Sequence, residues 1–209
     1  MSWQTFEQAL LDYNKKEVEN IVFHYLEEED ELKFIDEYVV QALTSIGEKW
    51  ERGEVALSQV YMSSRLCEDI VLSQLKWKEA KRLNVPQIAI LTLEDYHTLG
   101  KRIVSAVVRA SGYTIYDYGT VSDANKIVER LLADNVKILL ISVLMYPSAL
   151  KIKDISKVIR KQIPTIKLLV GGAPFLMDVN LWKQVGADGW GRSAADDIAI
   201  IERWIEEGF

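Results

Sequence analysis

The sequence predicts an α/β protein in two parts, a four-helix bundle in residues 1–84 and a doubly wound, five-stranded parallel sheet in residues 85–209. Residues 1–82 have apolar side chains at helical spacing and contain no proline. From residue 87 onward, short apolar runs alternate with amphipathic stretches of helical length. The runs are apolar almost without interruption, which is typical of parallel strands covered by helices on both faces.

The N-terminal part contains four apolar stripes with short connections, which predicts an antiparallel helical bundle. Most aromatic side chains of the stripes are expected to lie in its core. His24 has no second residue of metal-binding type beside it, so we expect a structural or solvent-facing side chain. The stripes run from Phe6 to Tyr13, from Val18 to Leu26, from Phe34 to Trp50 and, after Gly53, from Leu57 to Leu75.

The C-terminal part begins after a junction at Leu83–Pro86, because proline disfavours helix at the residue before it. Right-handed crossovers between parallel strands then give a doubly wound sheet. The expected strands are residues 87–93, 114–118, 137–143, 167–170 and 187–190. The expected helices are residues 100–111, 123–133 with Asp123 as the cap, 148 or 149 to 162, 180–185 and 193–207.

The loop after the first strand is the strongest candidate for a ligand-binding site. It reads Asp95-Tyr-His97-Thr-Leu-Gly100 and lies at the carboxyl end of a strand, where open α/β sheets bind their ligands. His97 is one of two histidines in the chain, and Asp95 stands two residues before it. An imidazole binds a metal best when its other nitrogen donates to a carboxylate, because that contact fixes the tautomer. These residues alone leave two interpretations open, a metal ligand or an exposed histidine beside a helix-capping aspartate.

Two more motifs follow later strands of the predicted sheet, Ser142-Val-Leu144 and Gly171-Gly172. Together with Asp95-x-His97-x-x-Gly100, this series resembles the cobalamin-binding domain of methionine synthase, of corrinoid methyl-carrier proteins and of cobalamin-dependent mutases. The N-terminal helices resemble the helical cap of the same family, so the resemblance covers about the whole chain. It implies a Rossmann-like domain that binds cobalamin, with the nucleotide tail in a slot beside the sheet. It also implies that His97 replaces the cofactor's dimethylbenzimidazole as the lower ligand of cobalt.

The resemblance further implies which residues surround the cofactor. Ser148 would extend a relay from His97 through Asp95 that adjusts charge when the cobalt–histidine bond forms or breaks, and the alternative is a plain helix cap. Gly171 and Gly172 would let the tail approach the backbone, and the alternative is a tight turn. The other implied cofactor contacts of this domain are Tyr96, Thr98, Leu99, Gly100, Ser142, Leu144, Tyr146 and Ala194.

The predicted cap departs from the family pattern at two positions. Methyl carriers usually have an aromatic residue at the position of Ala56, and light-sensing regulators have a histidine at the position of Tyr61. We expect Trp50, Leu57 and Tyr61 to shield the upper face of the cofactor instead.

Charge and composition exclude several classes of partner. The 209 residues include 25 basic and 31 acidic ones, and the net charge of −6 argues against nucleic acids and anionic membranes. The single cysteine, Cys67, excludes an intramolecular disulfide and fits a reducing compartment. No apolar run is long enough to cross a bilayer. We therefore expect a cytoplasmic protein.

The implied function is that of a corrinoid protein that carries a methyl group on cobalt from a substrate-specific methyltransferase to an acceptor methyltransferase. The cofactor performs the chemistry, so whether the chain is itself an enzyme stays open. One alternative is a cobalamin sensor that signals through movement of the cap. Another is the cobalamin-binding subunit of a carbon-skeleton mutase. The sequence identifies neither the methyl donor nor the methyl acceptor.

Overall fold

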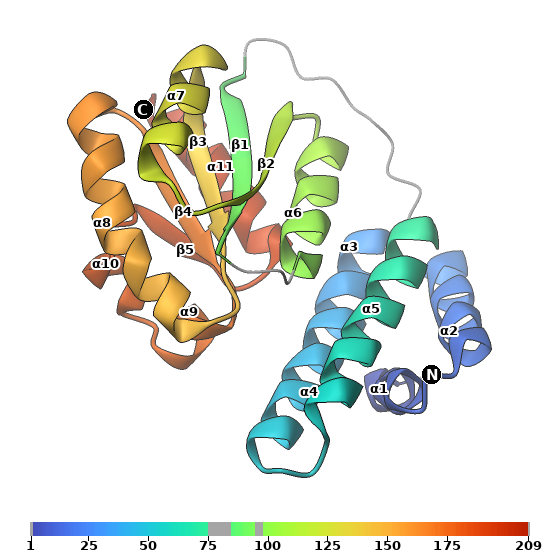
Figure 1. Cartoon of the computed structure of the whole chain (residues 1–209). Helices are drawn as coiled ribbons and strands as arrows, with labels where there is room; N and C mark the ends of the chain where they lie inside the picture. The colour runs from blue at the N-terminus through green and yellow to red at the C-terminus, as the bar shows by residue number, and fades with distance from the viewer. Residues whose placement is uncertain (1, 75–84, 95–97, 209) are drawn as a thin grey trace. The chain divides into compact units, whose positions relative to one another are not determined.

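The computed structural model describes residues 2–74, 85–94 and 98–208 (Figure 1). These residues belong to two compact units, one within residues 1–76 and one within residues 77–209. The predicted junction overlaps residues 75–84, which lie outside the described residues. The domain boundary predicted between residues 84 and 85 therefore stays a prediction.

The N-terminal unit is a four-helix bundle, as predicted. Its helices are α1 (Trp3–Leu11), α2 (Lys15–Glu28), α5 (Leu57–Gln74) and a continuous helix between them that consists of α3 (Glu31–Phe34), the π-helical stretch η1 (Ile35–Val40) and α4 (Gln41–Glu51). The side chains of Ser2 and Asn14 accept hydrogen bonds from backbone N–H groups in the first turns of α1 and α2. These caps fix where the two helices begin. Gly53 has a φ of 73° and follows the end of α4.

Aromatic residues form the centre of this bundle. Phe6 meets Phe34 edge-on with 5.4 Å between ring centroids, and Phe34 stacks on Tyr38 at 5.2 Å. The predicted apolar stripe that ends at Trp50 is buried only as far as Ile46, and Trp50 itself is 44% exposed. Trp50 therefore lies at the surface of the unit and not in its core.

The C-terminal unit is built on a parallel sheet of five strands in the order β2-β1-β3-β4-β5. The strands are β1 (Gln87–Leu93), β2 (Ile115–Val121), β3 (Val136–Ser142), β4 (Lys167–Gly171) and β5 (Gly189–Gly191). The strand order changes direction between β1 and β3, and this switch point is where such sheets bind their ligands. This is the doubly wound, Rossmann-like fold that the sequence predicts.

Helices cover both faces of the sheet. They are α6 (Leu99–Ala110), α7 (Ala124–Ala133), α8 (Tyr146–Gln162), α9 (Ala173–Met177), α10 (Leu181–Gln184) and α11 (Ala194–Glu207). Leu91 and Leu139 pack in one core with side chains of α7 and α8, whereas Ile90 and Leu140 pack in another with side chains of α6 and α11. Figure 1 shows these two pairs of helices on opposite faces. None of the described helices is both long and apolar enough to cross a bilayer.

Two helices differ from the prediction because of proline. α8 begins at Tyr146, two or three residues before its predicted start at Ser148 or Ala149, since Pro147 fits the first turn of a helix, where no N–H group is needed. The short helix α9 was not predicted, and Pro174 occupies its first turn in the same way. The expected solvent-facing side chain of His24 is observed, with its ring beside the carboxylate of Glu27.

Candidate functional site

Four small residues lie side by side at the carboxyl end of the sheet. The strand register pairs Thr92 of β1 with Ser142 of β3, Ser142 with Gly171 of β4, and Gly171 with Gly191 of β5. Each is the last or the next-to-last residue of its strand. We call Thr92, Ser142, Gly171 and Gly191 the small-residue row.

The small-residue row faces α6 and α11, because side chains on one face of a strand recur every two residues. Ile90, Leu140 and Leu169, each two residues before a member of the row, belong to the apolar core beneath these helices. A Cβ atom added to Gly189 would lie 3.1 Å from the ring of Trp204 in α11. On this face of the sheet, the large apolar side chains are therefore followed by small residues at the carboxyl edge.

At two glycines of this edge, the neighbouring atoms leave space for a side chain. A Cβ atom at Gly100, in the first turn of α6, would meet the hydroxyl oxygen of Ser142 at 3.4 Å. One at Gly171 would meet the carbonyl oxygen of Gly191 at 3.6 Å. Both are ordinary van der Waals distances, so each position has room that the described chain does not fill. A ligand entering here would meet backbone and small side chains.

Two buried polar groups beside this space have no partner among the described residues. Thr92 is fully buried, and its hydroxyl group makes no hydrogen bond within the described part of the chain. Asp197, in the first turn of α11, is only 6% exposed, and no described residue forms a hydrogen bond or an ion pair with its carboxyl group. Buried polar groups are normally hydrogen-bonded. Both groups therefore fit a site whose ligand is not part of the chain.

Gly172 has a structural requirement of its own. Its φ of 118° and ψ of 175° fall in a region that only glycine adopts readily. A Cβ atom at this position would lie 1.8 Å from the carbonyl oxygen of Val143, directly after β3. The tight-turn alternative is thus supported for Gly172, whereas Gly171 has open room beside it.

The chain after β3 presents apolar side chains at the surface. Leu144, Met145 and Tyr146 are 41%, 50% and 43% exposed. Ser148 is buried and is the third residue of α8, and Met145 precedes the helix without a side-chain cap. The alternative that Ser148 is a plain helix cap is therefore wrong.

The loop that carries the predicted metal ligand lies partly outside the described residues. Asp95, Tyr96 and His97 are not described, and their predicted roles stay predictions. On one side of them Glu94 follows β1 with a φ of 51°, and its carboxylate forms an ion pair with Lys151 of α8. On the other side Thr98 directly precedes α6, and Leu99 and Gly100 form its first turn. The described chain therefore enters and leaves this loop at the carboxyl edge of the sheet.

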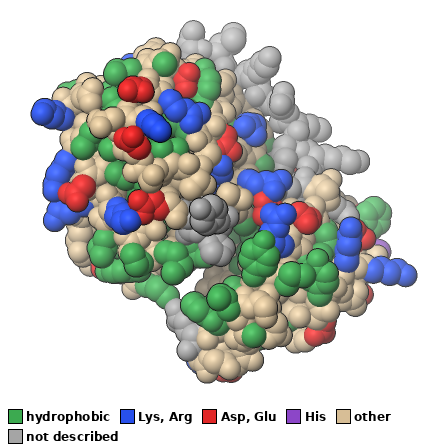
Figure 2. All heavy atoms as spheres, in the orientation of Figure 1, with side chains coloured by type: hydrophobic (Ala, Val, Ile, Leu, Met, Phe, Trp, Pro, Cys, Tyr) green, Lys and Arg blue, Asp and Glu red, His purple; other side chains and the backbone are tan. Residues whose placement is uncertain are grey.

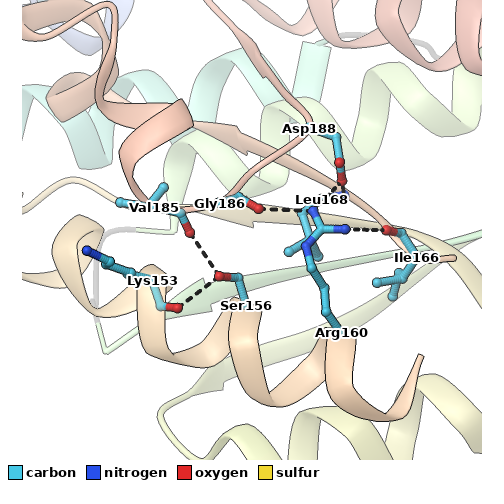
Figure 3. Close-up of polar contacts among 8 residues, drawn as sticks. All are labelled: Lys153, Ser156, Arg160, Ile166, Leu168, Val185, Gly186 and Asp188. Atoms are coloured by element: carbon cyan, nitrogen blue, oxygen red, sulfur yellow. Dashed lines mark hydrogen bonds and ion pairs between the residues drawn. The ribbon is translucent and has the colours of Figure 1, made fainter. Parts of the chain in front are cut away.

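Asp188, just before β5, forms hydrogen bonds with β4 and α8 (Figure 3). Its Oδ2 accepts hydrogen bonds from the backbone N–H of Leu168, at 2.7 Å, and from Nη2 of Arg160 in α8, at 2.8 Å. The same Nη2 donates to the carbonyl oxygen of Gly186, at 2.9 Å. These contacts fix the segment that enters β5 and so support the position of Gly191 in the small-residue row.

The remaining predicted site residues lie at the surface of the helical unit or at the start of α11. Trp50 is the last apolar residue of α4 and is exposed. Leu57 and Tyr61 are one helical turn apart on α5, and their exposed fractions are 63% and 54%. Figure 2 shows hydrophobic side chains at the surface of each unit.

Ala194 is the first residue of α11 and is buried, and Ser193 caps the helix by accepting a hydrogen bond from its first turn.

Three residues of this site were not identified from the sequence. Thr92 interrupts the apolar run that follows Gln87 in β1, and Asp197 interrupts the apolar spacing of Ala194, Ile201 and Trp204 in α11. These polar breaks in an apolar pattern are the signal that would have identified them. The third residue, Gly191, belongs to the segment 190–194, which the family resemblance implies beside the nucleotide tail, but only Ala194 was predicted as a contact; the place of Gly191 in the row depends on the pairing of distant strands.

Two family models match the chain, and both describe a B12 binding domain, one over residues 88–199 and one over residues 3–72. The first covers more than half of the chain. The chain therefore belongs to the family of B12-binding, that is cobalamin-binding, proteins. Its cofactor is cobalamin or another corrinoid.

Similar proteins match the chain over nearly its whole length. It is 27% identical to a corrinoid protein of Desulfitobacterium hafniense strain Y51 and covers 94% of both chains. It is 24% identical to the trimethylamine corrinoid protein of Methanosarcina barkeri, covering 94% of this chain and 93% of that one. The solved structure of the Methanosarcina barkeri monomethylamine corrinoid protein is 25% identical, with a TM-score of 0.80 over 94% of this chain and 95% of that chain. These matches confirm the resemblance to corrinoid proteins with a helical cap and a Rossmann-like domain.

Proposed function

We propose that this protein carries a methyl group on the cobalt of a bound corrinoid, from a substrate-specific methyltransferase to an acceptor methyltransferase. The main support is the small-residue row, which leaves room beside the sheet at the switch point of a cobalamin-binding fold. The match to methylamine corrinoid proteins over nearly the whole chain, including the helical unit, supports the same function. Methylamines are therefore the first methyl donors to test.

The corrinoid, when bound, supplies a cobalt ion that can take up and release a methyl group, and the protein supplies orientation, axial ligation and exclusion of water. We propose that His97 would ligate the cobalt and that Asp95 and Ser148 would hold its second ring nitrogen and any proton there. The nucleotide tail would lie along the small-residue row, beneath the first turns of α6 and α11. The exposed side chains of Trp50, Leu57 and Tyr61 would also contact the corrinoid.

A methyl-transfer assay tests the carrier function. The purified chain is loaded with hydroxocobalamin, reduced, and mixed with methylamines and the methyltransferases encoded beside its gene. We expect methylation of the bound corrinoid that depends on one partner, and its demethylation that depends on another. Tight corrinoid binding with no methylation by any such partner would instead favour a sensor of cobalamin.

Replacing His97 with alanine is expected to remove the protein nitrogen from cobalt while leaving weaker corrinoid binding, because most of the buried contact belongs to the tail. Electron paramagnetic resonance of the Co(II) form, with nitrogen-15 histidine in the protein, should show splitting from that nitrogen in the wild type only. His24→Ala is the matched control, because His24 is exposed and lies in the helical unit. Splitting from the benzimidazole nitrogen in the wild type would contradict the proposed ligand.

Replacing Lys151 with methionine is expected to weaken corrinoid binding about two- to fivefold, the range of a partly exposed ion pair. The change removes the partner of Glu94 and so loosens the residue that leads into the proposed ligand loop. Lys157→Met is the control, because Lys157 pairs with Asp154 on the exposed side of the same helix. Titration with hydroxocobalamin measures both variants, and equal losses in the two would show that the Glu94 contact has no particular role.

A further inference from the structure

The carboxyl group of Asp197 occupies the far end of the small-residue row. Its Oδ1 lies 2.0 Å from the place where a Cβ atom of residue 191 would stand, so the absence of a side chain at Gly191 makes room for this group. Gly191 in turn pairs with Gly171 in the sheet. The carboxyl group therefore lies against the end of β5, on the same face of the sheet as the row.

The surroundings of Asp197 favour an uncharged carboxylic acid. Burial raises the pKa of this carboxyl group well above its ordinary value, and the nearby negative charge of Asp196 raises it further. Asp196 has a partner, since its Oδ2 accepts a hydrogen bond from the backbone N–H of Arg192 at 3.2 Å. Asp197 has none among the described residues. A protonated carboxyl group both donates and accepts a hydrogen bond.

We propose that Asp197 recognises the base at the end of the corrinoid's nucleotide tail and makes this protein prefer a purine base over dimethylbenzimidazole. This inference rests on the proposed path of the tail along the small-residue row. The hydroxyl group of Thr92, at the other end of the row, likewise has no hydrogen-bond partner among the described residues, which supports a ligand with polar groups along the row.

The two bases differ in the edge that they offer to a buried carboxyl group. Adenine carries a ring nitrogen that accepts and an adjacent amino group that donates, so a carboxylic acid can form two hydrogen bonds with it. The outer edge of dimethylbenzimidazole carries two methyl groups and offers neither. Burying Asp197 against methyl groups leaves it unsatisfied, and an unsatisfied buried group weakens binding by roughly ten- to a hundredfold.

The test compares two corrinoids that differ only in the base, cobalamin and its adenine analogue, both in the hydroxo form. Equilibrium dialysis against the full chain gives the two dissociation constants. We expect the adenine form to bind at least about tenfold more tightly to the wild type. Asp197→Asn should keep this preference, because an amide also donates and accepts. Asp197→Leu should abolish or reverse it, and Asp196→Asn should leave it unchanged.

Equal affinities of the wild type for the two corrinoids would overturn the inference. So would a preference that Asp197→Leu leaves intact, since the base would then be recognised elsewhere. Circular dichroism shows whether each variant is folded. If Asp197→Leu does not fold, the comparison of the two corrinoids on the wild type still tests the inference. A base preference without methyl transfer would refute the proposed carrier function and leave this inference standing. Binding of neither corrinoid would refute the proposed tail site itself.

Discussion

Replacing Gly172 with alanine is expected to lower the free energy of unfolding by about 4 kcal/mol or more, enough to prevent folding of a marginally stable domain. The backbone at Gly172 costs about 1–3 kcal/mol for any residue with a side chain. The added methyl group would also collide with the carbonyl oxygen of Val143, since its Cβ atom would lie 1.8 Å away. This oxygen belongs to the backbone and cannot rotate aside, so β3 and β4 would have to separate at their carboxyl ends.

Gly171→Ala is the matched control, one residue away. Its Cβ atom would lie 3.6 Å from the nearest described atom, so we expect stability within about 1 kcal/mol of the wild type. The added methyl group would, however, project into the small-residue row and weaken corrinoid binding. Urea unfolding followed by circular dichroism measures the first effect, and cobalamin titration measures the second. A folded, stable Gly172→Ala variant would show that the end of β4 can move away from β3.

The same comparison explains what a bulky substitution can reveal about the tail site. A variant at Gly172 loses binding because its fold is disturbed, whether or not the tail passes nearby. A variant at Gly171 or Gly100 adds volume where the described chain leaves room. Only these two glycines therefore test the site without changing the sheet.

The fold could be predicted from the sequence because its signals are local. β1 has the predicted bounds of residues 87–93, since its apolar run is bounded by Pro86 and by a polar loop. The side chain of Asp123 caps α7 at the predicted start. The early start of α8 was missed because the first turn of a helix tolerates Pro147, which a sequence pattern treats as a barrier. Tertiary packing alone decides that Trp50 lies at the surface, because periodicity does not show where a buried stripe ends.

The candidate site could be predicted only in part, for a related reason. Ser142 and Gly171 belong to short motifs at strand ends and were identified from them. The row that they form with Thr92 and Gly191 depends on the register of four strands, which no local pattern encodes. Asp197 meets the row only through the packing of α11 on β5. The unpredicted residues are thus those whose role arises from contacts between distant segments.

Replacing Asp188 with alanine is expected to lower the free energy of unfolding by about 2–3 kcal/mol, because two hydrogen bonds to a charged acceptor are lost together. The change leaves the backbone N–H of Leu168 and the guanidinium group of Arg160 without their shared partner. Water reaches both side chains in part, since Asp188 is 26% and Arg160 33% exposed, which keeps the loss below that of a fully buried pair. Asp154→Ala is the control, since its ion pair with Lys157 is exposed and should contribute little to stability.

The Asp188 variant is also expected to weaken corrinoid binding, although Asp188 lies at the opposite end of β5 from the small-residue row. Its carboxylate fixes the segment that enters β5, and β5 is only three residues long, so a shift at its start carries Gly191 with it. The expected signature is a loss of affinity that Asp188→Asn partly restores, because an amide oxygen can still accept the hydrogen bond of Leu168. Urea unfolding and cobalamin titration of the three variants separate the two effects. A destabilised Asp188→Ala variant with unchanged affinity would show that β5 keeps its place in the row without this anchor.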